Sequence, residues 1–435
     1  MKISQIVSNF HSPFNLPFTT MKYPQLILVC LLFAAACSQP ESAPRTWQNI
    51  ESTLQTQLIT IADGDTLDLP EGNFMFTKSI TMDGKSNILI RGKGMDKTIL
   101  SFKNQTEGAE GLHISNGKNI VLEDFSVEDS KGDNVKVNDT RGITFRRIRS
   151  AWPDGGKNEN GAYALYPVLC KHVLIEESMA IGSSDAGIYV GQSDSVIIRN
   201  NKAYWNVAGI ESENSRWVEI YGNEAYDNTG GLLVFDLPGL TQYGHTTKVY
   251  KNNIHDNNHE NFATKGNVVA SIPPGTGVMI LATHNLEMTE NEIRDNKTVG
   301  TGIISYDLVA AINQGETEQE GAIGGVQTVD NSYKQDSLYN PYPYQIYIHH
   351  NTFENSHWFP SLSGDIGKLF LTKSFLNPPD VAYDGIPNPE KKDAQICVRE
   401  NGDITVMSLD AANDFKGLSK EPKELDCEGT KISLR

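Results

Sequence analysis

The sequence predicts an all-β solenoid, a fold in which short strands stack coil upon coil. The first observation is a near-repeat of 22 residues: residues 187–190 (GIYV) are echoed by residues 209–212 (GIES). The second is that apolar and polar residues alternate over three to five positions in each unit, which is strand periodicity. Because a unit with so few short strands cannot bury its own apolar face, successive units must stack to share a core.

Each coil contains a strand that ends near an asparagine. The pattern is apolar-x-apolar-x-x-Asn-x-apolar, and its clearest copies begin at Val196, Val218, Lys248, Leu286 and Ile346. Weaker copies begin at Ile88, Ile120, Ile143 and Val173. Asparagine tolerates the left-handed backbone of a turn, and its amide can bond the equivalent amide one coil away. We therefore expect a turn and a ladder of stacked amides at Asn201, Asn223, Asn253, Asn291 and Asn351.

Residues 1–36 are expected to be a signal peptide. The apolar run from Leu26 to Ala36 is too short to span a bilayer but is typical of a signal-peptide core, with Met21 as the expected start. The sequence Ala-Ala-Ala before Cys37 resembles the lipobox of bacterial lipoproteins, which implies lipidation of Cys37. It also implies a cell-envelope protein, held in the outer membrane by its lipid alone and facing the periplasm or the cell surface. The alternative is an ordinary signal peptide cleaved near Ala36.

The rest of the chain divides into three predicted segments: a linker and N-terminal cap at 37–60, the solenoid at 61–375, and a C-terminal cap at 376–435. Caps are needed because an open solenoid end is an unpaired strand edge. Cys397 and Cys427 are the expected disulfide of an exported chain, and Cys170 is expected to be buried and unpaired. Three insertions interrupt the repeat and are expected to form loops on one face that carry function; they lie at 237–247, 258–274 and 307–343.

Four stretches carry a resemblance to a known family: 184–193 (SDAGIYVGQS), 208–211 (AGIE), 230–238 (GGLLVFDLP) and 273–277 (PPGTG). They are similar to exported bacterial proteins with right-handed parallel β-helix repeats. The wider superfamily includes pectate lyases, mannuronan C-5-epimerases and the copper-maturation β-helix protein of nitrous oxide reductase. The resemblance covers roughly residues 60–430. It implies a right-handed parallel β-helix with coils of about 22–24 residues, and it does not by itself imply an activity.

One outward strip of side chains is the candidate site. Side chains alternate along a strand, so inward Ile188 and Ile210 place Tyr189 and Glu211 outward. The same alternation places Glu213 outward, and the register carried upstream adds three further residues. The predicted strip is exposed and consists of His113, Lys136, Tyr166, Tyr189, Glu211 and Glu213, with Asp236 just beyond its strand and Asp185 near its edge.

These residue types favour an acidic polysaccharide or oligosaccharide as the partner. Tyrosine rings offer flat faces to sugars, and carboxylates and lysine offer directional hydrogen bonds. Cleaving a uronate by elimination, or epimerising it, needs its carboxylate neutralised and a base that removes the C5 proton. Lys136 or His113 is the candidate for one task, and a calcium ion held by Glu211, Glu213 and Asp236 is the candidate for the other. The Asp-Pro-His-Asp type of motif of the epimerases is absent, as is a paired-aspartate strand of the pectate-lyase kind.

Other hypotheses stay open. The protein is alternatively a non-enzymatic envelope scaffold, or a metal- or redox-partner protein of the copper-maturation type with an envelope protein as its partner. The strip is alternatively no more than a solvated polar face. A formal charge of −17 disfavours nucleic acid, because a strongly negative chain repels polyanions unless a basic patch or a bound cation intervenes. Zinc is not favoured, since His255 and His259 span a turn rather than a helix, and His349 and His350 only flank the last coil.

Overall fold

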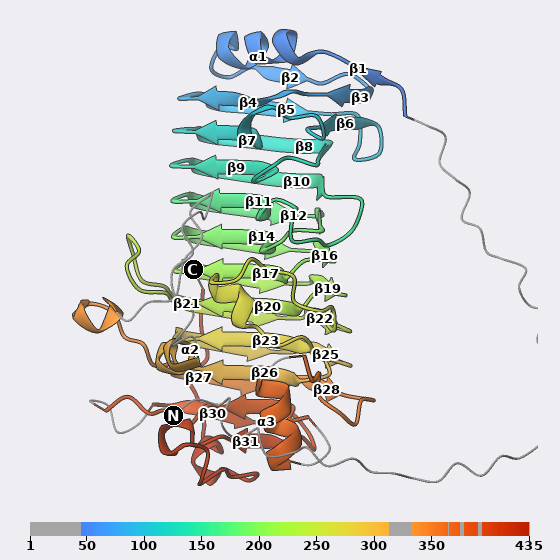
Figure 1. The fold of residues 1–435 in the computed structure, drawn as a ribbon. Coiled ribbons are helices and arrows are strands. Elements are labelled where there is room, and N and C mark those ends of the chain that lie inside the picture. The colour runs from blue at the N-terminus through green and yellow to red at the C-terminus, as the bar shows by residue number, and fades with distance from the viewer. Residues whose placement is uncertain (1–44, 313–331, 364, 375–377, 390–393, 435) are drawn as a thin grey trace, which may run out of the picture. The chain divides into compact units, whose positions relative to one another are not determined.

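The computed structural model describes residues 45–312, 332–363, 365–374, 378–389 and 394–434. The expected signal peptide, its start at Met21 and the lipidation of Cys37 lie outside these residues. Within them, no helix combines the length and the apolar character needed to cross a membrane. The described residues from Trp47 onward belong to one compact unit, shown in Figure 1.

This unit is a parallel β-helix, as the sequence predicts, and its coils are built from three stacks of strands (Figure 1). Face 1 consists of β4 (Lys78–Asp83), β7 (Glu107–Ser115), β9 (Val135–Asn138), β11 (Tyr163–Val168), β14 (Ala186–Gly191), β17 (Ala208–Glu213), β20 (Gly230–Phe235), β23 (Thr276–Leu281), β26 (Val299–Ile304), β29 (Val381–Tyr383) and β31 (Val406–Ser408).

The other two stacks form one continuous hydrogen-bonded sheet, because the long strands β8 and β10 contribute to both. Face 2 consists of β2 (Thr66–Asp68), β5 (Ser86–Arg91), β8 (Lys118–Glu128), β10 (Arg141–Ala151), β12 (Lys171–Glu176), β15 (Asp194–Arg199), β18 (Arg216–Tyr221), β21 (His245–Tyr250), β24 (His284–Thr289), β27 (Tyr344–His349) and β30 (Ile396–Arg399). Face 3 adds β1 (Trp47–Gln48), β3 (Gly72–Met75), β6 (Thr98–Ser101), β13 (Met179–Ile181), β16 (Lys202–Tyr204), β19 (Glu224–Tyr226), β22 (Asn253–His255), β25 (Glu292–Arg294) and β28 (Thr352–Glu354).

In the residues that the structure describes, the helices are few and lie outside the coils. They are α1 (Glu51–Thr60), α2 (Tyr306–Ile312) and α3 (Asp365–Ser374), together with 3₁₀ turns at Val268–Ser271, Ser332–Gln335, Ala411–Asn413 and Lys423–Leu425. Leu54 and Leu58 of α1 are buried in the solenoid core. Gln55 exchanges two hydrogen bonds of 2.9 Å with the backbone of Thr81 in β4. The helix therefore covers apolar side chains and backbone groups at the N-terminal end of the solenoid.

The inward side chains form one continuous core. Ile188, Ile210 and Leu232 pair in register on face 1, and each is fully buried. Val196 and Val218 do the same on face 2. The step between these partners is the 22-residue repeat of the sequence, so the repeat is one coil of the solenoid.

The asparagine ladder exists, with one residue shifted from the expected column. Its side-chain amides join Asn201, Asn223, Asn252, Asn291, Asn351 and Asn401 by hydrogen bonds of 2.8–3.1 Å. Asn252 takes the place expected for Asn253, because Thr247 and not Lys248 pairs with Val218. Threonine at an inward position hides the start of this copy from a search for apolar residues. A second ladder of Asn206, Asn228, Asn257 and Asn296 follows a later turn of each coil.

Parallel pairing continues past residue 375, where the solenoid was expected to end. The strands β29, β30 and β31 extend faces 1 and 2. Cys397 lies in β30 and is joined by a disulfide to Cys427, 30 residues further along the chain. Cys170 is buried and unpaired. The C-terminal segment is therefore partly coil and partly a tail tied to it by the expected cysteine pair.

The insertions pack onto the outward side of face 1, as expected of loops that share one face. The first contributes Tyr243, the second Val268 and Val269, and the third Tyr333 and Tyr339. These side chains join outward residues of β14, β20 and β23 in a second hydrophobic cluster. Residues 313–331 of the third insertion lie outside the described part of the chain. Because the second cluster covers part of face 1, it limits the surface of that face that a ligand can contact.

Candidate functional site

The predicted column on face 1 has the expected register. His113 pairs with Lys136, Lys136 with Tyr166, and Tyr189 with Glu211. Gly191 likewise pairs with Glu213. Asp236 follows directly after β20. Neighbouring coils of parallel strands lie about 4.8 Å apart, so the strand register brings His113, Lys136, Tyr166, Tyr189 and Glu211 into one column and places Glu213 in the neighbouring column of the same face.

The prediction of an exposed strip is wrong for the downstream part of this column. The buried members, with their exposed fractions, are Tyr166 (8%), Tyr189 (5%), Glu211 (2%), Glu213 (4%) and Asp236 (1%). The physical reason is the second hydrophobic cluster, in which apolar side chains of the insertions cover the outward side. His113 and Lys136 lie upstream of this cover and stay partly exposed. The tyrosines are therefore not flat platforms for sugars.

Three tyrosines pack together beneath the insertions. The ring centroids of Tyr163, Tyr166 and Tyr189 lie 4.4–5.0 Å apart. The hydroxyl of Tyr189 donates a 2.6 Å hydrogen bond to Oε1 of Glu213. Burial raises the pKa of all three phenols, and nearby carboxylates raise it further. The three phenols are therefore neutral at physiological pH, and that of Tyr189 acts as a hydrogen-bond donor.

Four carboxyl groups lie beside these tyrosines and form what we call the acidic cluster: Asp133, Asp185, Glu211 and Glu213. Burial is the main cause of their raised pKa values, which reach about 7 for Asp133 and Glu213 and about 8 for Asp185. The pKa of Glu211 rises well above its usual range because of burial and the neighbouring Asp185 and Glu213. Oε2 of Glu211 is buried without a hydrogen-bond partner. Much of the cluster is therefore protonated near neutral pH.

The upstream end of face 1 is open, and we call it the polar shelf: Thr81, Asp83, His113, Ser115, Lys136 and Asn138, none of which is buried. The ammonium of Lys136 lies 3.6 Å from Oε1 of Glu110, 3.7 Å from Oδ2 of Asp133 and 5.1 Å from the ring centre of Tyr166. Nε2 of His113 lies 2.6 Å from Oδ1 of Asn138. Lys136 therefore belongs to the polar shelf and, by its ion pair with Asp133, also contacts the acidic cluster.

The expected calcium ligands do not converge. In the described part of the chain, Glu211, Glu213 and Asp236 do not form a group whose carboxylate oxygens all lie within 4.8 Å of one another. Oδ1 of Asp236 instead accepts a 2.7 Å hydrogen bond from the N–H of Gly244. Leu233 and Phe235 occupy the register positions next to Glu211 and Glu213 in the following coil. In the described residues these three carboxylates are therefore not brought together as the ligands of one ion, and calcium binding by them stays a prediction.

The sequence pattern missed Asp133 and Tyr163 and placed Asp185 only at the edge of the site. Asp133 and Asp185 each come just before a strand of face 1, two residues before β9 and one before β14. An acidic residue just before each of two strands of face 1 is the sequence signal that could have identified Asp133 and Asp185 as members of the site. The strand rule did not capture it, because alternation assigns a direction only to residues inside a strand.

Comparisons with known proteins identify the family of the fold. The family described as right-handed β-helix region matches residues 69–234 and, in an overlapping match, residues 157–356. A search of curated proteins finds no significant match. Among solved structures, the A-module of a mannuronan C-5 epimerase from Azotobacter vinelandii has 13% identity and a TM-score of 0.48, over 78% of this chain and 91% of that chain.

Two further solved structures are similar at the same level. A periplasmic alginate epimerase has 14% identity and a TM-score of 0.41, over 73% of this chain and 81% of that chain. An alginate lyase from a Paenibacillus species has 13% identity and a TM-score of 0.36, over 56% of this chain and 94% of that chain. These sequence identities are too low to assign the reaction of a similar protein to this chain. The chemistry therefore has to be argued from the residues of the site.

Proposed function

The chain belongs to the right-handed β-helix family, and from this premise we propose that the polar shelf of face 1 binds an acidic polysaccharide next to Lys136. The observation that carries the proposal is the pair of Asp133 and Lys136. Asp133 is buried with a pKa raised to about 7, and it lies 3.7 Å from an ammonium group at the open end of the face. A general acid or base works best when its pKa lies near the operating pH.

Charge supports an anionic ligand here in spite of the acidic composition. The buried carboxyls of the acidic cluster bind protons near neutral pH and so carry less than their formal charge. The cation of Lys136 and the imidazole of His113 lie at the accessible side of the cluster. An anionic sugar at the polar shelf would meet the ammonium of Lys136, which it would share with Glu110 at 3.6 Å, and protonated carboxyls behind it. Both the ammonium and the protonated carboxyls can donate hydrogen bonds.

The finer proposal is a proton transfer at C5 of a uronate residue. Lys136 would neutralise the uronate carboxylate, which makes the C5 proton more acidic. Asp133, deprotonated above its pKa of about 7, would accept that proton as general base. The resulting carbanion can expel the glycosidic oxygen at C4, which takes up a proton from water and leaves as a hydroxyl; this is the reaction of a lyase. It can instead take a proton from water at C5 on the opposite side of the ring; this is the reaction of an epimerase.

Substitution of Lys136 tests the binding site. We expect Lys136→Met to weaken binding of alginate or pectate oligosaccharides about tenfold to a hundredfold, the loss typical of a hydrogen bond to a charged group. Isothermal titration calorimetry on the unmodified chain and the variant measures the change. The matched control is Lys171→Met, which removes an exposed lysine at the start of β12 on face 2 and should leave the affinity unchanged.

Substitution of Asp133 tests the reaction. We expect Asp133→Asn to keep the binding affinity and to lower turnover about 10²–10⁴-fold, the usual contribution of a general base. Absorbance at 235 nm detects elimination, and proton NMR of the polymer detects a changed ratio of epimers. Binding without any turnover in the unmodified chain would contradict the reaction but not the binding site. No binding to alginate, pectate or related glycans, with or without Ca²⁺, would overturn the whole proposal.

A further inference from the structure

A second group of side chains gathers where face 2 turns towards face 3, near the C-terminal end of the solenoid. His349 is the last residue of β27, and His350 follows it in a left-handed turn with φ of 54°. Glu400 follows β30 in the next coil with φ of 59°. The N–H of His350 donates to the carbonyl of Glu400 over 2.9 Å. His350 and Glu400 therefore occupy the same turn position in neighbouring coils.

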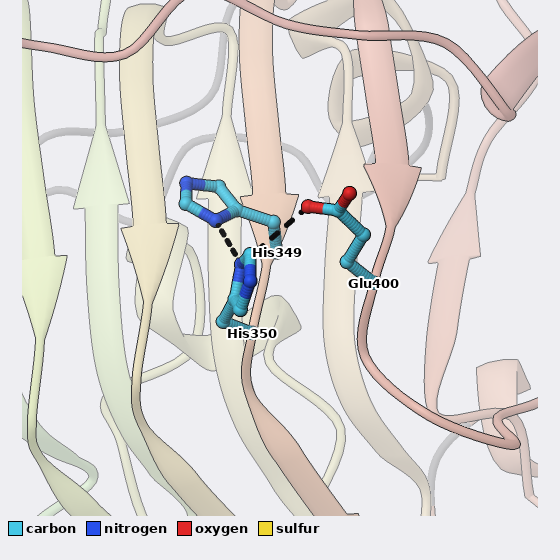
Figure 2. Close-up of side chains that lie close together, drawn as sticks. All are labelled: His349, His350 and Glu400. Atoms are coloured by element: carbon cyan, nitrogen blue, oxygen red, sulfur yellow. Dashed lines mark hydrogen bonds and ion pairs between the residues drawn. The ribbon is translucent and has the colours of Figure 1, made fainter.

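The potential ligand atoms of these residues point toward one another (Figure 2). Nδ1 of His349 and Nδ1 of His350 lie 2.7 Å apart, and Nδ1 of His350 lies 3.7 Å from Oε2 of Glu400. One ligand atom from each of the three residues lies within 4.8 Å of the others, and no other such group of three occurs in the described residues. Two imidazoles and a carboxylate are a donor set that suits divalent transition metals, whereas Ca²⁺ and Mg²⁺ prefer oxygen ligands.

A buried carboxylate holds His349 in the form that a metal requires. Oε1 of Glu287 lies 3.1 Å from Nε2 of His349, and both side chains are almost fully buried. Oε2 of Glu287 is itself held by the ammonium of Lys248 at 3.2 Å and by the N–H of Ile432 at 2.6 Å. Because an ionised carboxylate only accepts hydrogen bonds, the contact with Glu287 favours the tautomer of His349 that has its proton on Nε2 and its lone pair on Nδ1. A carboxylate behind a histidine is a recurrent support of metal ligands.

The ring of His349 is also fixed in place, while the rest of the group is accessible. Tyr347 stacks on His349 with ring centroids 4.1 Å apart. The side chains of His350 and Glu400 are 54% and 46% exposed, so solvent can complete the coordination. A zinc ion bound to both nitrogens at about 2.0–2.1 Å in tetrahedral geometry needs them to part by roughly 0.6 Å. Rotation of the exposed His350 side chain can supply that shift.

We propose that His349, His350 and Glu400 bind a divalent transition metal ion of the zinc class, with Glu287 as the positioning residue behind His349. The site stands apart from the proposed polysaccharide site, because β27 and β30 belong to face 2 and the polar shelf belongs to face 1. The bound ion would join the coil of β27 to the coil of β30. It would therefore stabilise the C-terminal end of the solenoid as well as offer open coordination positions.

Metal titration of the tag-free, chelator-treated chain tests the proposal. We expect one Zn²⁺ per chain by isothermal titration calorimetry, and visible absorption bands of bound Co²⁺ as an independent readout. Glu287→Gln should weaken Zn²⁺ binding about 10–100-fold and shift the Co²⁺ bands. His350→Ala removes a ligand and should cost at least as much. The exposed position of His350 means that the metal-free variant should melt at the same temperature as the unmodified chain.

The matched control is His357→Ala, which removes a partly exposed histidine outside the group and should leave the metal affinity unchanged. Zn²⁺ should raise the melting temperature of the unmodified chain and of His357→Ala, but not that of His350→Ala. Absence of Zn²⁺ and Co²⁺ binding to the unmodified chain would overturn the proposal. Equal affinity in His350→Ala and the unmodified chain would overturn it too, because the ion would then lie elsewhere.

Discussion

Replacing Asn252 by alanine is expected to lower the free energy of unfolding by about 3–5 kcal/mol, through loss of several buried hydrogen bonds at once. Oδ1 of Asn252 accepts from the backbone N–H and from the side-chain amide of Asn223, each over 3.0 Å. Its Nδ2 donates to the carbonyl of Ile220 and to Oδ1 of Asn291, each over 2.9 Å. Alanine leaves these partners in a dry interior, where each unsatisfied group costs about 1–3 kcal/mol.

The adjacent asparagine provides the matched control. Asn253 lies at the start of β22 and is partly exposed, and its side chain accepts one 2.9 Å hydrogen bond from Nη2 of Arg294. We expect Asn253→Ala to cost less than about 1 kcal/mol, because water can replace a single bond at the surface. Urea denaturation of both variants, followed by circular dichroism, measures the difference. Equal losses in the two variants would show that the ladder does not stabilise the solenoid.

The free energy of unfolding is expected to fall as the pH rises from about 4 to about 8. In a typical protein the free energy of unfolding is close to its maximum in much of this pH range. The buried carboxyls of the acidic cluster contribute to this effect: Asp133 and Glu213 have pKa values of about 7, Asp185 has a pKa of about 8, and the pKa of Glu211 lies well above its usual range. Burial also raises the pKa values of Asp236 and Asp384, which act in the same direction. In the unfolded chain such groups titrate near pH 4. Between these limits the folded state holds protons that the unfolded state has released, so each rise in pH favours unfolding.

The slope should be about 1.4 kcal/mol per pH unit for every proton that only the folded state holds. Below pH 4 the trend should reverse, because carboxylates such as Glu176, whose pKa is lowered by hydrogen bonds to Arg146 and Arg199 that outweigh its burial, then become protonated and lose their ion pairs. Denaturant titrations at pH 4, 5, 6, 7 and 8 give the curve.

Glu213→Gln should flatten this curve, because glutamine cannot release a proton and its Oε1 can still accept the hydrogen bond from Tyr189. The control is Glu354→Gln, which changes an exposed residue of β28 and should leave the slope as it is. An unmodified chain whose stability is flat or rising between pH 5 and pH 8 would contradict the raised pKa values of the acidic cluster. It would also remove the reason for regarding Asp133 as a general base.

The coil and its register can be read from the sequence because both depend on local patterns. Between β14 and β20 the repeat has no insertion, so counting 22 residues from Tyr189 leads directly to its partner Glu211. The count fails at Asn252 and Asn253, where a polar Thr247 occupies an inward position at the end of the first insertion, 237–247. A pattern of apolar residues can identify a coil, but a single polar residue inside it can shift the alignment by one position.

The amino-acid pattern is enough to predict a parallel β-helix, the side chains that point inward, and the outward residues that share a column. Which of those outward residues are buried depends on the tertiary fold, because the residues that cover them are as distant in the sequence as Val268 and Tyr339. The tertiary fold also brings His349 and His350 next to Glu400 of the following coil. The ladder asparagines that directly follow His350 and Glu400, Asn351 and Asn401, are 50 residues apart in the sequence. Strand alternation acts between neighbours in the chain, whereas burial, pKa shifts and the meeting of ligands depend on how remote segments pack.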